Sequence, residues 1–163
     1  LPPGIVVKRI IPVAGEAHCR FDADSREYSY YIYDHKDPFL EDRAFFYPYA
    51  LDAGLLNQAA AILMEYRDFT SFSKRNTQVH SFDCTILRSE WTREGDCLCY
   101  QVKGNRFLRG MVRGLVGTML HVGRGKTSLE GFRSVIEAKD CSRADFSVPP
   151  HGLFLRKVNY AYL

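Results

Sequence analysis

The chain has 163 residues, 46% of them hydrophobic and 25% charged, which is the composition of an ordinary globular domain with a sizeable core. Its formal net charge is +3, from 22 basic and 19 acidic residues, so nucleic-acid binding is permitted but would have to show in where the charges sit. No apolar run is long enough to cross a bilayer, and five cysteines at irregular spacing favour reduced thiols in a cytosolic protein without a metal centre.

The chain opens with a Leu-Pro-Pro-Gly turn at residues 1–4, with no Met, and runs directly into apolar residues. We interpret this start as an internal cut in a longer protein. Alternating apolar side chains predict strands over 5–13 and 27–33. A polar loop is expected over 34–42, and the aromatic run 44–49 is expected as a short strand or an ordered loop.

The next predicted element is a helix from Asp52, a plausible N-cap, to about residue 66, with an apolar stripe on one face. A long polar loop follows over 67–80. Residues 84–91 and 97–102 alternate on either side of a turn that contains glycine, which predicts a β-hairpin.

Residues 106–122 carry apolar side chains at the helical period and predict a long helix that ends at glycine 123. Arg106, Arg109 and Arg113 recur at i, i+3 and i+7, so they would share one face of this helix.

Three glycines, at positions 110, 114 and 117, lie beside that face, and each costs an interior helix about 1 kcal/mol against alanine. Their number indicates that something packs closely against the helix backbone. Two interpretations stay open: an anionic partner held by the arginines, or close helix–strand packing with solvated arginines.

A short helix capped by Ser128 is predicted to about residue 138, followed by a loop over 139–150 and a final strand over 153–162. From residue 28 onward the order is therefore strand, helix, two strands, one or two helices, strand. This is the split βαβ pattern, which predicts an α+β fold: a ferredoxin-like antiparallel sheet with helices on one face.

Four motifs now coincide in order and spacing. They are Arg20-Phe21 with Arg26-Glu27-Tyr28-Ser29-Tyr30, then Asp68-Phe69-Thr70-Ser71-Phe72, then Gly104-Asn105-Arg106-Phe107-Leu108 running to Val116-Gly117, and Gly152-Leu153-Phe154-Leu155. Together they resemble the TruA-type tRNA pseudouridine synthases over nearly the whole chain. The resemblance implies that residues 1–25 end the family's N-terminal half or connect its halves, and that 26–163 form its C-terminal α+β domain.

What the resemblance implies is an enzyme with two similar α+β halves that share a large sheet and bind RNA across a basic cleft. Such enzymes isomerise uridine to pseudouridine in the anticodon arm of tRNA, use no metal or organic cofactor, and are usually homodimers. They attack with an aspartate in an Arg-Thr-Asp-Ala-Gly motif, which this chain does not contain. We therefore expect a fragment that lacks its nucleophile and is inactive alone. Asp68 is rejected as a substitute because its place beside Phe69 fits a loop or helix-end anchor.

Three catalytic positions follow from the resemblance, and each has an ordinary alternative. Tyr28 corresponds to the tyrosine that stacks on the target base, but it could be a simple strand aromatic. Arg113 corresponds to the arginine that pairs with the catalytic aspartate and keeps it ionised, but it could be a solvated helix residue. Leu153 corresponds to a position in a strand beside the active site, but it could be a core residue.

Basic residues near these motifs are candidate phosphate contacts, and about half of them could be merely solvated charges. Asn105 could contact RNA or cap the predicted helix. The candidates are Arg20, Arg26, Lys74, Asn105, Arg106, Arg109, Arg124 and Lys126.

Two non-enzymatic alternatives remain. A ferredoxin-like sheet with exposed aromatics can bind RNA without catalysis, although no run here matches the RNP1 pattern of such modules. A plain assembly domain would use the glycine-rich helix as a packing surface and would show no salt-dependent binding of tRNA.

Overall fold

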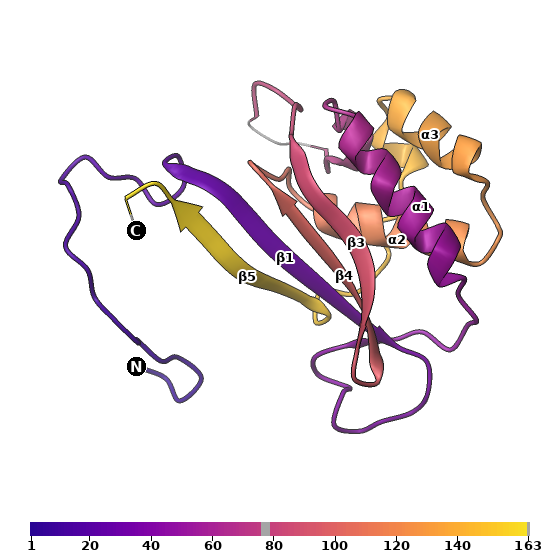
Figure 1. Ribbon diagram of the computed structural model, residues 1–163, viewed down its shortest axis with the longest axis horizontal. Coiled ribbons are helices and arrows are strands. Elements are labelled where there is room, and N and C mark those ends of the chain that lie inside the picture. Colours follow the sequence, from indigo (N-terminus) through magenta and orange to yellow (C-terminus); the bar gives the residue numbers. More distant parts are fainter. Residues whose placement is uncertain (76–78, 163) are drawn as a thin grey trace.

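The computed structural model describes residues 1–75 and 79–162, and it is an α+β domain with a long N-terminal arm (Figure 1). The strands are β1 (Ala23–Tyr33), β2 (Phe45–Phe46), β3 (Ile86–Glu94), β4 (Cys97–Gly104) and β5 (Leu153–Tyr160). The helices are α1 (Ala53–Ile62), α2 (Met111–Gly123) and α3 (Leu129–Glu137). Short 3₁₀ turns occur at Leu63–Glu65, Thr70–Phe72 and Cys141–Arg143. Positions 76–78 of the predicted loop lie outside the described residues.

β1 is the central strand of the sheet. It pairs antiparallel with β4 on one edge and antiparallel with β5 on the other, where β2 adds a short parallel pairing. β3 pairs antiparallel with β4, so β4 lies between β1 and β3. This is the split βαβ arrangement, and it confirms the predicted ferredoxin-like fold. Only the two-residue parallel pairing of β2 departs from a fully antiparallel sheet.

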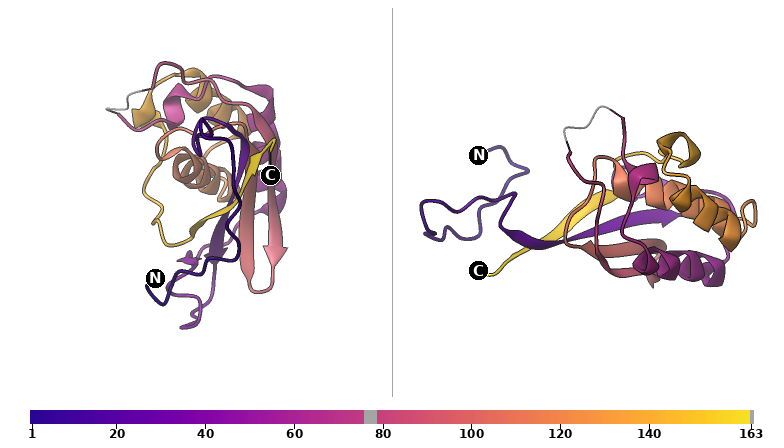
Figure 2. Two further views of the ribbon diagram at one scale, coloured as in Figure 1. Left: turned by 90° about the vertical axis from the view of Figure 1, so that its left-hand side faces the viewer. Right: turned by 90° about the horizontal axis from the view of Figure 1, so that it is seen from above.

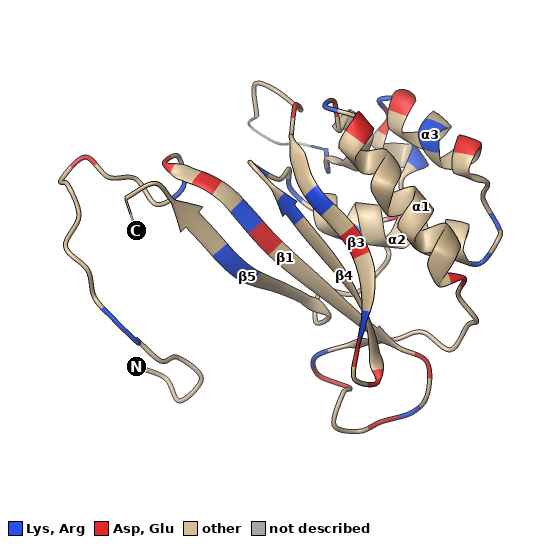
Figure 3. Ribbon diagram, viewed as in Figure 1, with Lys and Arg blue, Asp and Glu red and all other residues tan. Residues whose placement is uncertain are grey.

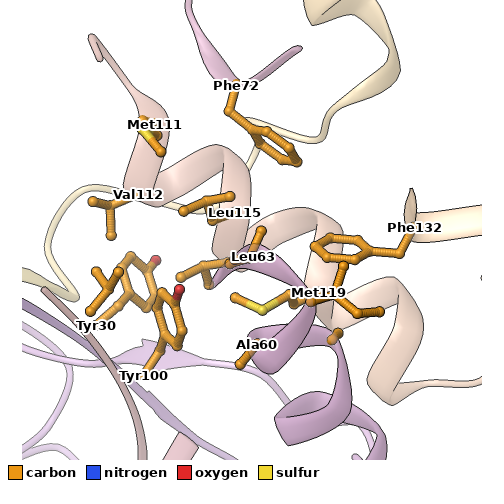
Figure 4. Close-up of a cluster of buried hydrophobic side chains, with 14 of the residues drawn as sticks. Tyr30, Ala60, Leu63, Phe72, Tyr100, Met111, Val112, Leu115, Met119 and Phe132 are labelled. Carbon is orange, nitrogen blue, oxygen red and sulfur yellow. The ribbon is translucent and has the colours of Figure 1, made fainter. Parts of the chain in front are cut away.

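The core forms where β1 and β4 meet α2. Tyr30 of β1 lies opposite Tyr100 of β4, and both side chains are fully buried. Met111, Leu115 and Met119 of α2 recur at helical spacing and cover them, as Figure 4 shows. The period-2 pattern of the strands and the helical period of α2 thus meet in one hydrophobic layer.

Two helix starts follow the sequence prediction closely. Asp52 Oδ1 accepts a hydrogen bond from the Leu55 N–H at 2.9 Å, and Ser128 Oγ accepts one from the Gly131 N–H at 3.0 Å. Both are N-caps of the expected kind. α1 also protects the edge of the sheet, because the Asn57 side chain bonds both the N–H and the carbonyl of Trp91 in β3.

The predicted strand over 5–13 is wrong. These residues form no strand but part of an arm that runs away from the domain, with Ile10 88% exposed (Figures 1 and 2). Their alternation satisfies the pattern of a strand, but a strand needs a neighbour to accept its hydrogen bonds, and none of the described residues supplies one here.

The predicted helix over 106–122 begins five residues late, at Met111. Gly110 stands before it with φ +80°, a left-handed conformation that ends helical continuity on its N-terminal side. Asn105 is not the helix cap: its Oδ1 accepts from the backbone N–H groups of Thr85 and Arg106 at 2.7 and 2.8 Å. Arg106 therefore precedes α2, as Arg109 does, and the predicted helical face of three arginines does not form.

Candidate active site

The three predicted catalytic positions can each be related to one buried side chain, Tyr30. Tyr28 lies two residues earlier on β1, and Leu153 is the cross-strand partner of Tyr30 on β5. Arg113 in the first turn of α2 donates to the carbonyl of Val148, the residue before the one that Tyr30 bonds. Burial raises the pKa of Tyr30, and the charge of Arg113 opposes that rise. The hydroxyl donates to the carbonyl of Pro149 at 2.6 Å. The structure thus brings the three positions to one end of the core.

Tyr28 is half-buried against the core. Its ring meets Phe107 edge-on, with the ring centroids 5.1 Å apart. Burial raises the pKa of Tyr28, with the charge of Arg26 acting against it. The phenol is therefore protonated at neutral pH and can donate a hydrogen bond. This packing is also what an ordinary strand aromatic would show.

Arg113 is not a solvated helix residue. Its Nε donates to the carbonyl of Val148 at 2.7 Å, and its Nη2 donates to the carbonyl of Phe146 at 3.1 Å. A guanidinium has five N–H groups, so donors remain for a further acceptor. Among residues 1–75 and 79–162 no carboxylate pairs with Arg113.

The glycines of α2 admit the segment that holds Arg113. A β-carbon on Gly114 would lie 2.8 Å from the Phe146 ring, and one on Gly117 would overlap the carbonyl oxygen of Asp145. The close packing expected from the glycines is therefore confirmed, and residues 144–148 of the chain itself provide it. We call these five residues the strap. Gly110 has another role, because it takes the left-handed conformation beside Lys74.

We expect Gly117→Ala to lower the free energy of unfolding by about 2 kcal/mol, because overpacking against the strap backbone outweighs the gain in helix propensity. Gly114→Ala is the matched control on the same helix. There the neighbour is a side-chain ring that can shift, so a change within about 1 kcal/mol is expected. Urea unfolding of the chain measures both, and a Gly117→Ala variant as stable as the parent would contradict the packing.

Four of the candidate RNA contacts gather at one end of the sheet. The Arg26 guanidinium donates to the carbonyls of Asn105, at 3.2 Å, and of Arg20. Arg106 follows Asn105 directly and is bonded through its backbone to that side chain. A second pair lies at the start of α2, where the Lys74 N–H donates to the Arg109 carbonyl at 3.0 Å.

Arg124 and Lys126 do not join these residues. They follow the C-terminal end of α2, whose 13 residues span about 20 Å. The Arg124 guanidinium lies 3.8 Å from the centroid of the Tyr49 ring, a cation–π contact that occupies it locally. Figure 3 shows Lys and Arg spread over many elements of the fold.

Asp68 behaves as the anchor that the sequence predicts. Its Oδ1 accepts from the N–H and the hydroxyl of Thr70 at 2.9 and 2.6 Å, and its Oδ2 pairs with Lys139 at 2.9 Å.

In the part of the chain that the structure describes, no three His, Cys, Asp or Glu side chains cluster as metal ligands would. None of the described helices is long and apolar enough to span a membrane.

Sequence reasoning missed the residues that hold the strap. Asp145 bonds His121 and Thr118 of α2, and Tyr30 bonds Pro149 just after the strap. The one available signal was the run of small residues on α2, which indicated close packing without naming its partner.

Comparison with known proteins agrees with this fold. Residues 59–161 match the family model described as tRNA pseudouridine synthase, and the chain belongs to that family. The resemblance to the TruA type is supported by curated relatives that carry the name tRNA pseudouridine synthase A. The relative from Parabacteroides distasonis is 50% identical over 160 residues, and that from Porphyromonas gingivalis is 46% identical over 163 residues. Each alignment covers 98% of this chain but only 64% of the relative's length.

Proposed function

We propose that these 163 residues are the larger part of a TruA-type enzyme that isomerises uridine to pseudouridine in the anticodon arm of tRNA. Residues 26–163 would be its C-terminal domain and residues 1–25 the end of, or link from, its N-terminal half. The observation that carries the proposal is that Tyr28 and Leu153 neighbour Tyr30 in the sheet, while Arg113 and Tyr30 bond adjacent carbonyls, in a chain of this family. We further propose a cytoplasmic homodimer that uses no metal or organic cofactor.

The reaction breaks an N-glycosidic bond and rejoins the base through carbon, which calls for a carboxylate beside the ribose and a base taken out of its stack. Residues outside this segment would supply the carboxylate. The remaining donors of Arg113 would pair with it and keep it ionised. Tyr28 would stack on the flipped base, and its protonated hydroxyl would donate a hydrogen bond during the reaction. Leu153 would form the adjacent wall.

The basic residues at the end of β1 and the start of α2 would contact the phosphates of the tRNA. Arg20, Arg26, Lys74, Asn105, Arg106 and Arg109 form this set. Arg124 and Lys126, at the other end of α2, would contact a more distant part of the same RNA.

The test is Tyr28→Phe in a protein of the relatives' full length that contains these residues, below called the longer protein. The stack survives but the hydroxyl is lost. We expect turnover, followed by tritium release from labelled uridine in tRNA, to fall about tenfold or more, while tRNA affinity changes much less.

Tyr31→Phe is the matched control, since Tyr31 follows on the same strand and its hydroxyl bonds Glu94. Loss of affinity without a selective loss of turnover would favour a non-catalytic RNA-binding module. Absence of salt-dependent tRNA binding in the parent would favour an assembly domain.

A further inference from the structure

One face of α2 is built to receive the strap. Gly114, Gly117, Thr118 and His121 recur at i, i+3, i+4 and i+7, so they lie on the same side of the helix. The two glycines let the strap backbone approach, and the two polar side chains bond to it. Arg113 begins the same face, one residue before Gly114.

Asp145 is the point at which the strap is fixed. Its N–H donates to Thr118 Oγ1 at 3.0 Å, and its Oδ2 lies 2.9 Å from His121 Nε2. Partial burial acts to raise the pKa of Asp145, but hydrogen bonds from Ser147 and His121 outweigh it and hold that pKa below its usual value. The side chain is therefore an ionised acceptor at neutral pH. Asp145 as a residue is bound to α2 at two places, through its backbone N–H and through its carboxylate.

The second carboxylate oxygen of Asp145 shapes the rest of the strap. Asp145 Oδ1 accepts from the Ser147 N–H at 2.7 Å, which closes a tight turn over these residues. The carbonyls on either side of Ser147, those of Phe146 and Val148, are the two that accept from Arg113. The turn that Asp145 caps thus sets both acceptors that orient the guanidinium.

We propose that Asp145, held by His121 and Thr118, is a positioning residue for the reaction: it fixes the strap carbonyls that aim Arg113 at the carboxylate it serves. This inference rests on the proposed function. It follows that Asp145 affects turnover without touching the substrate. Errors of about 1 Å in such positioning can cost about a hundredfold in rate.

The experiment compares Asp145→Ala and Asp145→Asn in the longer protein, with kcat, KM for tRNA and the folded fraction measured for each. We expect kcat per folded molecule of Asp145→Ala to fall about 10- to 100-fold, with KM within about threefold of the parent. Asp145→Asn keeps an acceptor for the Ser147 N–H, so it should recover to within about fivefold of the parent.

Asp140→Ala is the matched control. Asp140 Oδ1 also accepts from a serine N–H two residues on, that of Ser142, at 2.9 Å, but that turn does not contact Arg113. The proposal is overturned if Asp145→Ala keeps its kcat, if Asp145→Asn is as slow as Asp145→Ala, or if Asp140→Ala loses as much. Arg113→Ala in the same assay separates a failure of the proposed role of Arg113 from a failure of the inference about Asp145. If it stays active, the proposed role of Arg113 fails and this inference with it; an inactive Arg113→Ala beside a normal Asp145→Ala overturns only the inference.

Discussion

Arg113→Ala in the longer protein is expected to lower kcat about a thousandfold, while tRNA affinity changes by less than about threefold. The guanidinium is fixed by the Phe146 and Val148 carbonyls before any substrate arrives, so its free donors need no reorganisation to meet a carboxylate. Single-turnover rates with labelled tRNA measure the loss of rate, and filter binding at two salt concentrations measures the affinity for tRNA.

Arg113→Lys and Arg133→Ala sharpen this prediction. An ammonium carries its three donors on one nitrogen and cannot reproduce the planar fork that spans the two carbonyls and a carboxylate, so Arg113→Lys should recover only a small part of the rate. Arg133 of α3 forms a bidentate ion pair with Glu65 of the 3₁₀ turn Leu63–Glu65, and its replacement should leave kcat unchanged. Equal losses in Arg113→Ala and Arg133→Ala, or a loss of affinity alone, would contradict the role of Arg113.

Local pattern was enough to predict most of the fold. The strands, the hairpin and the two capped helices follow from period-2 and period-3.6 alternation and from Asp52 and Ser128. The failures have one cause: a pattern states what a segment can form, and the neighbours decide whether it does. Residues 5–13 alternate without a partner strand, and residues 106–109 have the helical period but precede a left-handed glycine.

The candidate site was less predictable than the fold. Tyr28, Arg113 and Leu153 were named through the family resemblance, since their residue types alone fit a strand aromatic, a surface cation and a core residue. The contacts between the strap and α2 join residues that are 24 or more positions apart in the sequence, such as His121 and Asp145. No local periodicity indicates contacts over such a separation. Only the cost of glycines in a helix pointed to it.

Residues 1–163 alone are expected to show no turnover, whereas the longer protein is expected to be active. Asp145 of the strap and Asp68, the acid rejected from the sequence, are already engaged: Asp145 bonds His121 and Ser147, and Asp68 bonds Thr70 and Lys139. Arg113 meets carbonyls and no carboxylate within the described residues. Without a nucleophile the remaining groups can bind and orient a base but cannot break its glycosidic bond.

Tritium release from labelled uridine in tRNA, run side by side on the two proteins, measures this difference. Circular dichroism must first establish that residues 1–163 are folded, because an unfolded chain would be inactive for a trivial reason. Salt-dependent tRNA binding by the folded segment should persist, since the basic residues at the end of β1 and the start of α2 are all present in it. Turnover by residues 1–163 alone would mean that an acid within them performs the attack, and Asp68→Asn and Asp145→Asn would then test those two acids first.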